Sequence, residues 1–197
     1  MRYNFAFDLD GTITTKEILP VIAKELGMQK EMAELTQKAM SGEIPFDQSF
    51  AKRVQMLKKI PISEVRGIIL DIPLNKDVVA FVKKNRNRCH IVTQNLDVWI
   101  EPLLHRIGAP YLTSTADYQG DQLKGIKNIL RKKTIHTMID YPVVAIGDGY
   151  NDLEMIVDAP LSIAYGGIHK PVSAILDVVS YAVYDSKQLC LLLNQLL

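Results

Sequence analysis

The chain has 197 residues, of which 48% are hydrophobic and 23% are charged. A chain of this length and composition can bury a core without disulfides or structural metals, which excludes disorder as its main character. Its 23 basic and 22 acidic residues leave a formal net charge of +1, so charge provides no case for binding nucleic acid or an anionic membrane. With two cysteines, no apolar run of membrane-spanning length and an acidic N-terminal segment, we expect a globular, cytoplasmic protein.

The N-terminal third combines one strand with a long helical stretch. A buried strand is predicted over residues 3–7, and it ends in the acidic turn Asp8-Leu-Asp-Gly-Thr12. Apolar residues then recur at helical spacing from Met28 to Ala39 and from Phe46 to Leu57. We predict that residues 15–73 form an inserted bundle of four helices, the cap, over a core formed by residues 1–14 and 74–197.

Strands and helices alternate through the rest of the chain. Helices are predicted over 76–87, 96–107 and 124–134, and strands over 90–92, 111–114, 143–146, 161–164 and 179–184. This alternation predicts an α/β fold, a Rossmann-like parallel sheet with helices on both faces, into which the cap is inserted.

Polar residues end three of the predicted strands. Ligands of such a sheet bind beyond the carboxyl ends of its strands, so these residues are expected to meet there. They are Asp8 and Asp10, then Thr93-Gln94-Asn95, and then Gly147-Asp148-Gly149-Tyr150-Asn151-Asp152. Carboxylates this close repel one another unless a cation joins them, and hard oxygen ligands favour Mg²⁺ or Ca²⁺. The glycines of the third segment are not a dinucleotide fingerprint, because Asp152 occupies the third glycine position.

These motifs carry a resemblance. The pair Asp8-Leu-Asp-Gly-Thr12 and Gly147-Asp-Gly-Tyr-Asn-Asp152, with Thr93 at a strand end and a lysine before the second motif, resembles the haloacid-dehalogenase superfamily of phosphatases. The segment from Lys38 to Val54 is similar to the cap of the phosphoserine phosphatases within that superfamily. The resemblance implies Mg²⁺-dependent hydrolysis of a small phosphomonoester, O-phospho-L-serine first, through an aspartyl-phosphate intermediate.

The resemblance also implies a role for each site residue. Asp8 would be the nucleophile and Asp10 the general acid and base, while Thr93 and Lys124 would bind the phosphate, with Lys127 as the alternative lysine. The Arg131-Lys132-Lys133 run is interpreted as a solvated helix end. Met40 and Phe46 also match pocket positions. The implied metal set is Asp8, Asp10, Asp148 and Asp152, and the implied substrate set is Glu17, Arg53, Thr93, Gln94, Asn95 and Asn151.

Two departures from the family pattern leave alternatives open. Gln94 and Asn95 stand where the phosphoserine phosphatases normally have two glycines after a serine, and the short stretch 117–123 predicts that a hairpin near the site is missing. The alternatives are a phosphatase for another small metabolite, a phosphotransferase to an acceptor such as homoserine, and a catalytically silent binding module. The sequence predicts no oligomeric state.

Overall fold

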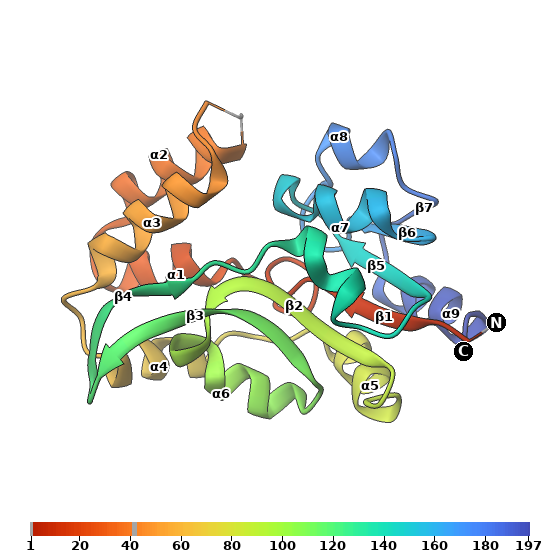
Figure 1. Ribbon diagram of the computed structural model, residues 1–197, viewed down its shortest axis with the longest axis horizontal. Coiled ribbons are helices and arrows are strands. Elements are labelled where there is room, and N and C mark those ends of the chain that lie inside the picture. Colours follow the sequence, from red (N-terminus) through yellow and green to blue (C-terminus); the bar gives the residue numbers. More distant parts are fainter. Residues whose placement is uncertain (1, 41–42) are drawn as a thin grey trace.

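A seven-stranded sheet forms the centre of the molecule (Figure 1). The structure is a computed structural model that describes residues 2–40 and 43–197; Gly42 and the side chain of Met40 lie outside the described set. The strand order is β4-β3-β2-β1-β5-β6-β7, and every neighbouring pair is parallel except β3 with β4. The strands are β1 (Asn4–Phe7), β2 (Cys89–Leu96), β3 (Tyr111–Gln119), β4 (Gln122–Asn128), β5 (Val143–Gly147), β6 (Leu161–Tyr165) and β7 (Tyr181–Val183).

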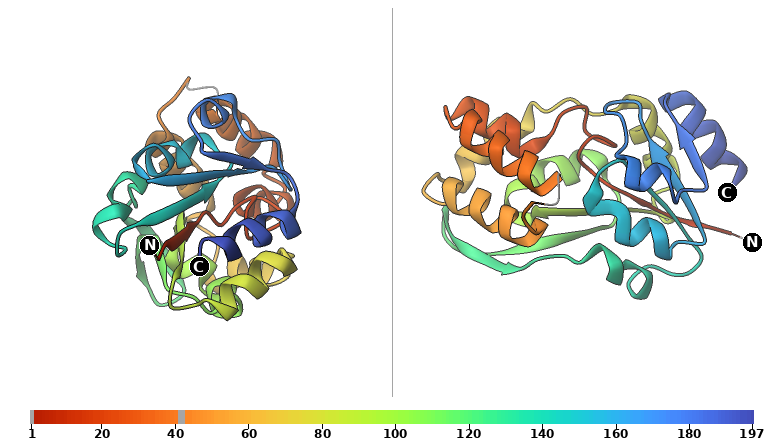
Figure 2. Two further views of the ribbon diagram at one scale, coloured as in Figure 1. Left: turned by 90° about the vertical axis from the view of Figure 1, so that its right-hand side faces the viewer. Right: turned by 90° about the horizontal axis from the view of Figure 1, so that it is seen from above.

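Successive side chains of the central strands point to opposite faces of the sheet, so both faces are apolar. Phe5 and Phe7 of β1 join the hydrophobic cluster with the helices of one face, whereas Ala6 between them joins the cluster on the other. The first face is covered by α5 (Lys76–Lys84), α6 (Asp97–Ile107) and α9 (Ser186–Gln195). The second is covered by the 3₁₀ helix η1 (Lys132–Thr137), α7 (Leu153–Asp158) and α8 (Ser173–Leu176) (Figure 2). The predicted sheet with helices on both faces is confirmed.

Four helices lie between β1 and α5 in the chain, beyond the carboxyl end of β1 (Figure 1). The chain returns from them through an isolated bridge between Thr14 and Leu74. Their buried side chains belong to the same cluster as the first face of the sheet. The helices are α1 (Ile18–Glu25), α2 (Gln29–Met40), α3 (Phe46–Leu57) and α4 (Ile62–Leu70). None of the helices in the described ranges has the length and apolarity to span a bilayer.

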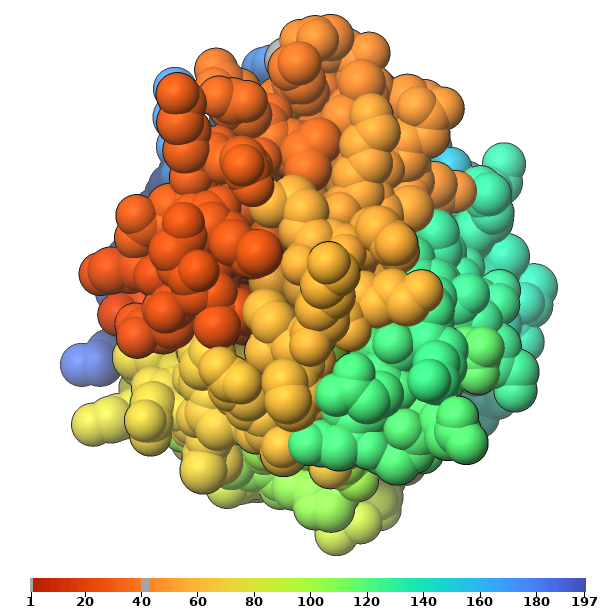
Figure 3. Space-filling model, turned by 90° about the vertical axis from the view of Figure 1, so that its left-hand side faces the viewer, coloured from red at the N-terminus to blue at the C-terminus, as the bar shows by residue number. Residues whose placement is uncertain are grey.

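The segment 111–128 corrects two predictions. β3 and β4 form an antiparallel hairpin, so the helix predicted over 124–134 and the missing hairpin are both wrong. Gly120, with φ +57°, allows the tight turn between the two strands. At this turn the Asp121 carbonyl accepts from the Ile62 amide at 2.9 Å, and the Asp121 carboxylate accepts from the Ser63 amide at 2.8 Å. The hairpin therefore caps α4 and lies beside the inserted helices (Figure 3).

Candidate active site

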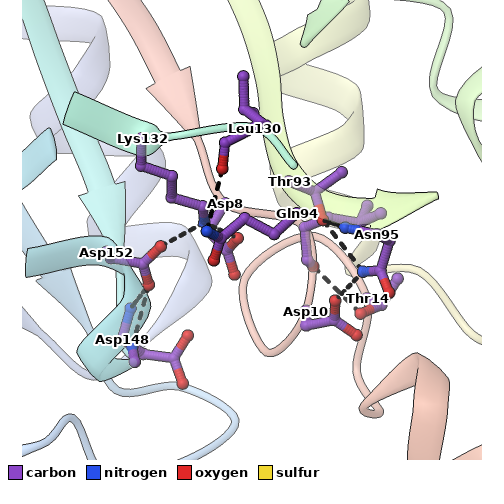
Figure 4. Close-up of polar contacts among 12 residues, drawn as sticks. Asp8, Asp10, Thr14, Thr93, Gln94, Asn95, Leu130, Lys132, Asp148 and Asp152 are labelled. Atoms are coloured by element: carbon purple, nitrogen blue, oxygen red, sulfur yellow. Dashed lines mark hydrogen bonds and ion pairs between the residues drawn. The ribbon is translucent and has the colours of Figure 1, made fainter. Parts of the chain in front are cut away.

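The carboxyl ends of three neighbouring strands meet at one edge of the sheet (Figure 4). Because β1 lies between β2 and β5, the residues that follow β1 lie between those of the other two strands. A cavity of about 530 Å³ opens there, between the strand ends and α1 to α3. The structure brings most of the predicted site residues to this cavity, whereas Lys124, its alternative Lys127 and Asp152 are not among the described residues that line it. The predicted residues that line it are Asp8, Asp10, Glu17, Phe46, Arg53, Thr93, Gln94, Asn95, Asp148 and Asn151.

The lysine beside Asp8 is Lys132. Its side chain is fully buried, and its Nζ donates to Asp8 and, at 2.5 Å, to Asp152 Oδ1 (Figure 4). Burial lowers the pKa of Lys132, but the two carboxylates outweigh burial and leave it raised, so the ammonium stays charged. The prediction of Lys124 is wrong, because Lys124 lies on β4 with its side chain exposed, and Lys127 is exposed there too.

Gln94 holds the segment that carries Lys132. Its side-chain Nε2 donates to the carbonyl of Leu130 at 3.0 Å, while the amide of Leu130 donates to Ser114 Oγ at 3.0 Å. Both backbone groups of Leu130 are therefore fixed by residues of β2 and β3, two positions before Lys132. Gln94 Oε1 is buried and has no hydrogen-bond partner among the described residues.

Asp8 and Asp148 lie close together, but among the described residues only the carboxylate of Asp8 has a bonding partner. Asp8 accepts from Lys132, whereas no partner in the described part of the chain bonds the carboxylate of Asp148. Burial, followed by the charge of Asp152, raises the pKa of Asp8 to about 8 and that of Asp148 to about 9. Oxygens of Asp8, Asp148 and Asp152 lie within 4.8 Å of one another. This is a buried cluster of oxygen donors whose repulsion a cation would relieve.

Asp152 is buried, and its carboxylate bonds groups that hold the other two aspartates in place. Its Oδ1 accepts from Lys132, and its Oδ2 accepts from the backbone amides of Asp148 at 3.1 Å and Gly149 at 3.0 Å. A Cβ at Gly147 would lie 2.5 Å from the Asp152 carboxyl carbon, so only glycine admits Asp152 to this position. Asp152 thereby fixes both the lysine and the backbone that carries Asp148.

Asp10 lies on the cavity side of the same loop. Its Oδ1 accepts from the Ile18 amide, at the start of α1, at 2.7 Å, and its Oδ2 accepts from Asn95 Nδ2. Burial, followed by the charge of Glu17, raises the pKa of Asp10 to about 7. A carboxyl group with a pKa near neutrality can both give and take a proton at physiological pH.

Gly11 follows Asp10 and lies against Asp148 and His169. It has φ +69°, and a Cβ at this position would lie 3.0 Å from Asp148 Oδ2 and 3.0 Å from His169 Cδ2. The glycine after Asp10 is therefore required both by backbone conformation and by the close approach of Asp148. His169 also lines the cavity.

The wall formed by the inserted helices carries one acid and one base. Arg53 of α3 is 7% exposed, its Nε donates to the Ser49 carbonyl at 3.4 Å, and its guanidinium lies 5.6 Å from the Phe46 ring centroid. It forms no ion pair with a described residue. Glu17 lies 3.6 Å from His169 Nε2, and burial, followed by the charge of Asp8, raises the pKa of Glu17 to about 7.

Comparison with known proteins assigns the family. Residues 5–156 match the model of the haloacid dehalogenase-like hydrolases, so the chain belongs to this family. Its relatives include the phosphoserine phosphatase of Methanocaldococcus jannaschii, 31% identical over 81% of this chain and 83% of that protein. Another is the phosphoserine phosphatase of Streptococcus thermophilus, 27% identical over 80% of this chain and 81% of that one. Against the phosphoserine phosphatase of Archaeoglobus fulgidus, 30% identical, the chain spans 51% of the relative's length.

Solved structures give the same picture of the fold. A substrate-bound phosphoserine phosphatase superposes with a TM-score of 0.81 at 24% identity, covering 98% of both chains. A phospho-aspartyl intermediate analogue of phosphoserine phosphatase superposes with a TM-score of 0.77 at 25% identity, covering 94% of this chain and 95% of that one. The inserted helices and the sheet are therefore shared across nearly the whole chain.

Proposed function

We propose that this chain is a Mg²⁺-dependent phosphomonoesterase whose preferred substrate is O-phospho-L-serine. The observation that carries the proposal is the arrangement around Asp8 at the cavity. Asp8 forms an ion pair with the buried Lys132, and it lies beside the carboxylate of Asp148, which no described residue bonds. The relatives named phosphoserine phosphatase support the substrate. The two cysteines are unpaired, which supports a cytoplasmic location.

The donor set fits a hard divalent cation. Asp8 and Asp148 offer carboxylate oxygens within 4.8 Å of one another, and no described residue bonds the carboxylate of Asp148. With the backbone carbonyl of Asp10 they would hold Mg²⁺, which as a Lewis acid would neutralise charge on a phosphate oxygen. Both oxygens of Asp152 are already bonded within the protein, so we assign Asp152 to support rather than to direct ligation.

The chemistry proceeds in two displacements at phosphorus. A carboxylate oxygen of Asp8 forms a bond to phosphorus while the bond to the ester oxygen breaks, and that oxygen takes the proton of Asp10. Water then attacks phosphorus and gives a proton to Asp10, and the bond from phosphorus to Asp8 breaks. Inorganic phosphate leaves, and both aspartates return to their starting states.

Two groups would neutralise charge on the transferred phosphoryl group. Lys132 lies against Asp8, where it lowers the cost of negative charge on both nucleophile and phosphate. The Thr93 hydroxyl, 1% exposed on β2, lines the same cavity and can donate to a phosphate oxygen.

We propose that residues 15–73 form the cap and that residues 1–14 and 74–197 form the core. Arg53 and Glu17 lie on the cap side of the cavity. Arg53 has no ionic partner among the described residues, so its planar guanidinium can bind the substrate carboxylate through two hydrogen bonds. Glu17 would accept from the substrate ammonium. Asn151 lines the cavity on the core side and would contact the phosphate end.

The experiment is a screen of the purified chain against phosphorylated metabolites with Mg²⁺ and then with EDTA. Phosphate release from O-phospho-L-serine should exceed that from the other esters and stop with EDTA. Preference for another ester would reject the substrate, and release unchanged by EDTA would reject the metal. Adding homoserine and measuring phosphohomoserine distinguishes hydrolysis from transfer, because a hydrolase forms only inorganic phosphate.

A further inference from the structure

We propose that Asn95 is a positioning residue that orients both Asp10 and Thr93, in contrast to the substrate contact predicted from sequence. The inference rests on the proposed function. Asn95 is 7% exposed. Its Nδ2 donates to Asp10 Oδ2 and to Thr93 Oγ1, the latter at 3.0 Å, and its backbone amide donates to the same Thr93 oxygen at 3.2 Å (Figure 4).

The side-chain amide of Asn95 has one hydrogen for each of its two acceptors, Asp10 and Thr93. The NH₂ group of the Asn95 amide faces Asp10, because Asp10 Oδ2 accepts from Asn95 Nδ2. That group has two hydrogens, one for Asp10 and one for Thr93. Since Asp10 Oδ1 accepts from the Ile18 amide at 2.7 Å, both carboxylate oxygens are fixed and the group cannot rotate freely.

The contacts of Asn95 also determine what Thr93 can do. A hydroxyl oxygen has two acceptor sites and one proton. Two N–H groups of Asn95 occupy the acceptor sites, and the Thr93 proton is donated to none of the described residues. The proton is therefore available to an acceptor in the cavity, which is the role that a phosphate oxygen would fill.

A glycine at position 95 could supply only the backbone contact. The side chain of Asn95 adds a link between the group that transfers the proton and the group that binds the phosphate. These two groups come from different strand ends, β1 and β2, whose spacing must be kept for the reaction. Asn95 therefore affects the chemical step through Asp10 and Thr93, and it does not need to touch the substrate.

The test compares Asn95→Ala with the matched variant Asn128→Ala, which removes an exposed amide from β4. Substrates are O-phospho-L-serine and aryl phosphates whose leaving groups range from p-nitrophenol to more basic phenols. For Asn95→Ala we expect kcat on phosphoserine to fall about 10- to 100-fold, with KM changed less than about threefold. Asn128→Ala should match the parent chain.

The aryl series isolates the action of Asn95 on Asp10. A good leaving group needs little protonation, so kcat/KM should fall least for p-nitrophenyl phosphate and progressively more as the phenol becomes more basic. In an Asp10→Asn background, Asn95→Ala should cause a smaller loss than in the parent chain, because only the part that acts through Thr93 remains. A rise in KM with kcat unchanged, or an equal loss across the series, would overturn the proposal. Poor turnover of phosphoserine with normal turnover of aryl esters would reject the proposed substrate and leave this test valid.

Discussion

Replacing Lys132 by Met tests how much the two buried ion pairs contribute to stability and to catalysis. Methionine has a similar length but no charge, so Asp8 and Asp152 would remain buried without the cation that they share. Removing one partner of a buried pair costs about 3–5 kcal/mol. For a chain of 197 residues this corresponds to a fall in Tm of about 6–20 °C. The loss of a placed positive charge should also lower kcat at least about 100-fold.

The control is Lys124→Met, which removes a lysine of the same type from an exposed strand position. It should change stability by less than about 0.5 kcal/mol and leave kcat within about twofold. Thermal melting by circular dichroism and phosphate release, measured well below both melting temperatures, separate loss of fold from loss of chemistry. An active Lys132→Met, or an inactive but folded Lys124→Met, would refute the assignment of the lysine.

Three further predictions concern the glycine, the cap arginine and the metal. Gly11→Ala should lower stability by about 1–2 kcal/mol, because of its φ of +69° and the contact with Asp148, and it should weaken Mg²⁺ binding in calorimetry. Arg53→Ala should raise KM for phosphoserine about 10- to 100-fold but leave phosphoethanolamine, which has no carboxylate, nearly unchanged; equal effects on both would contradict carboxylate recognition. The pKa values of Asp8 and Asp148, about 8 and 9, exceed their ordinary 3.8, so the metal-free fold holds protons that the unfolded chain has lost. Its stability should therefore fall as the pH rises from 7 to 9, and the gain in Tm on adding Mg²⁺ should increase over the same range; a constant gain would contradict this.

The acidic part of the site could be predicted because its geometry is local. Asp8 and Asp10 follow one buried strand and Asp148 follows another, and parallel strands bring their carboxyl ends to one edge of a sheet. Buried strands are recognised from short apolar runs, so the prediction of these three residues does not depend on the length of any connection between strands.

The lysine could not be predicted in the same way because it depends on the path between strands. The residues 122–128 form an edge strand, on which Leu123 is buried and Lys124 is exposed. Lys132 instead begins a 3₁₀ helix, and it is buried while Arg131 and Lys133 on either side are exposed. In sequence the three cations are equivalent. The buried Leu130 and Ile135 nearby are the signal that this run lies against the core.

The positioning role of Asn95 could not be predicted from the sequence either. An amide that replaces glycine beside a predicted phosphate site suggests contact with the substrate, and Asn95 does line the cavity. Its hydrogens, however, are directed to Asp10 and Thr93, and only the positions of β1 and β2 in space reveal this.

Trapping the covalent intermediate tests the central claim most directly. The chain is mixed with O-phospho-L-serine and Mg²⁺, quenched in acid within milliseconds and digested for mass spectrometry. The account predicts one phosphoryl group on the peptide that contains Asp8, formed in the parent chain and absent in Asp8→Asn, which should also release no phosphate. A phosphoryl group on another residue such as Thr93, or full turnover by Asp8→Asn, would contradict it.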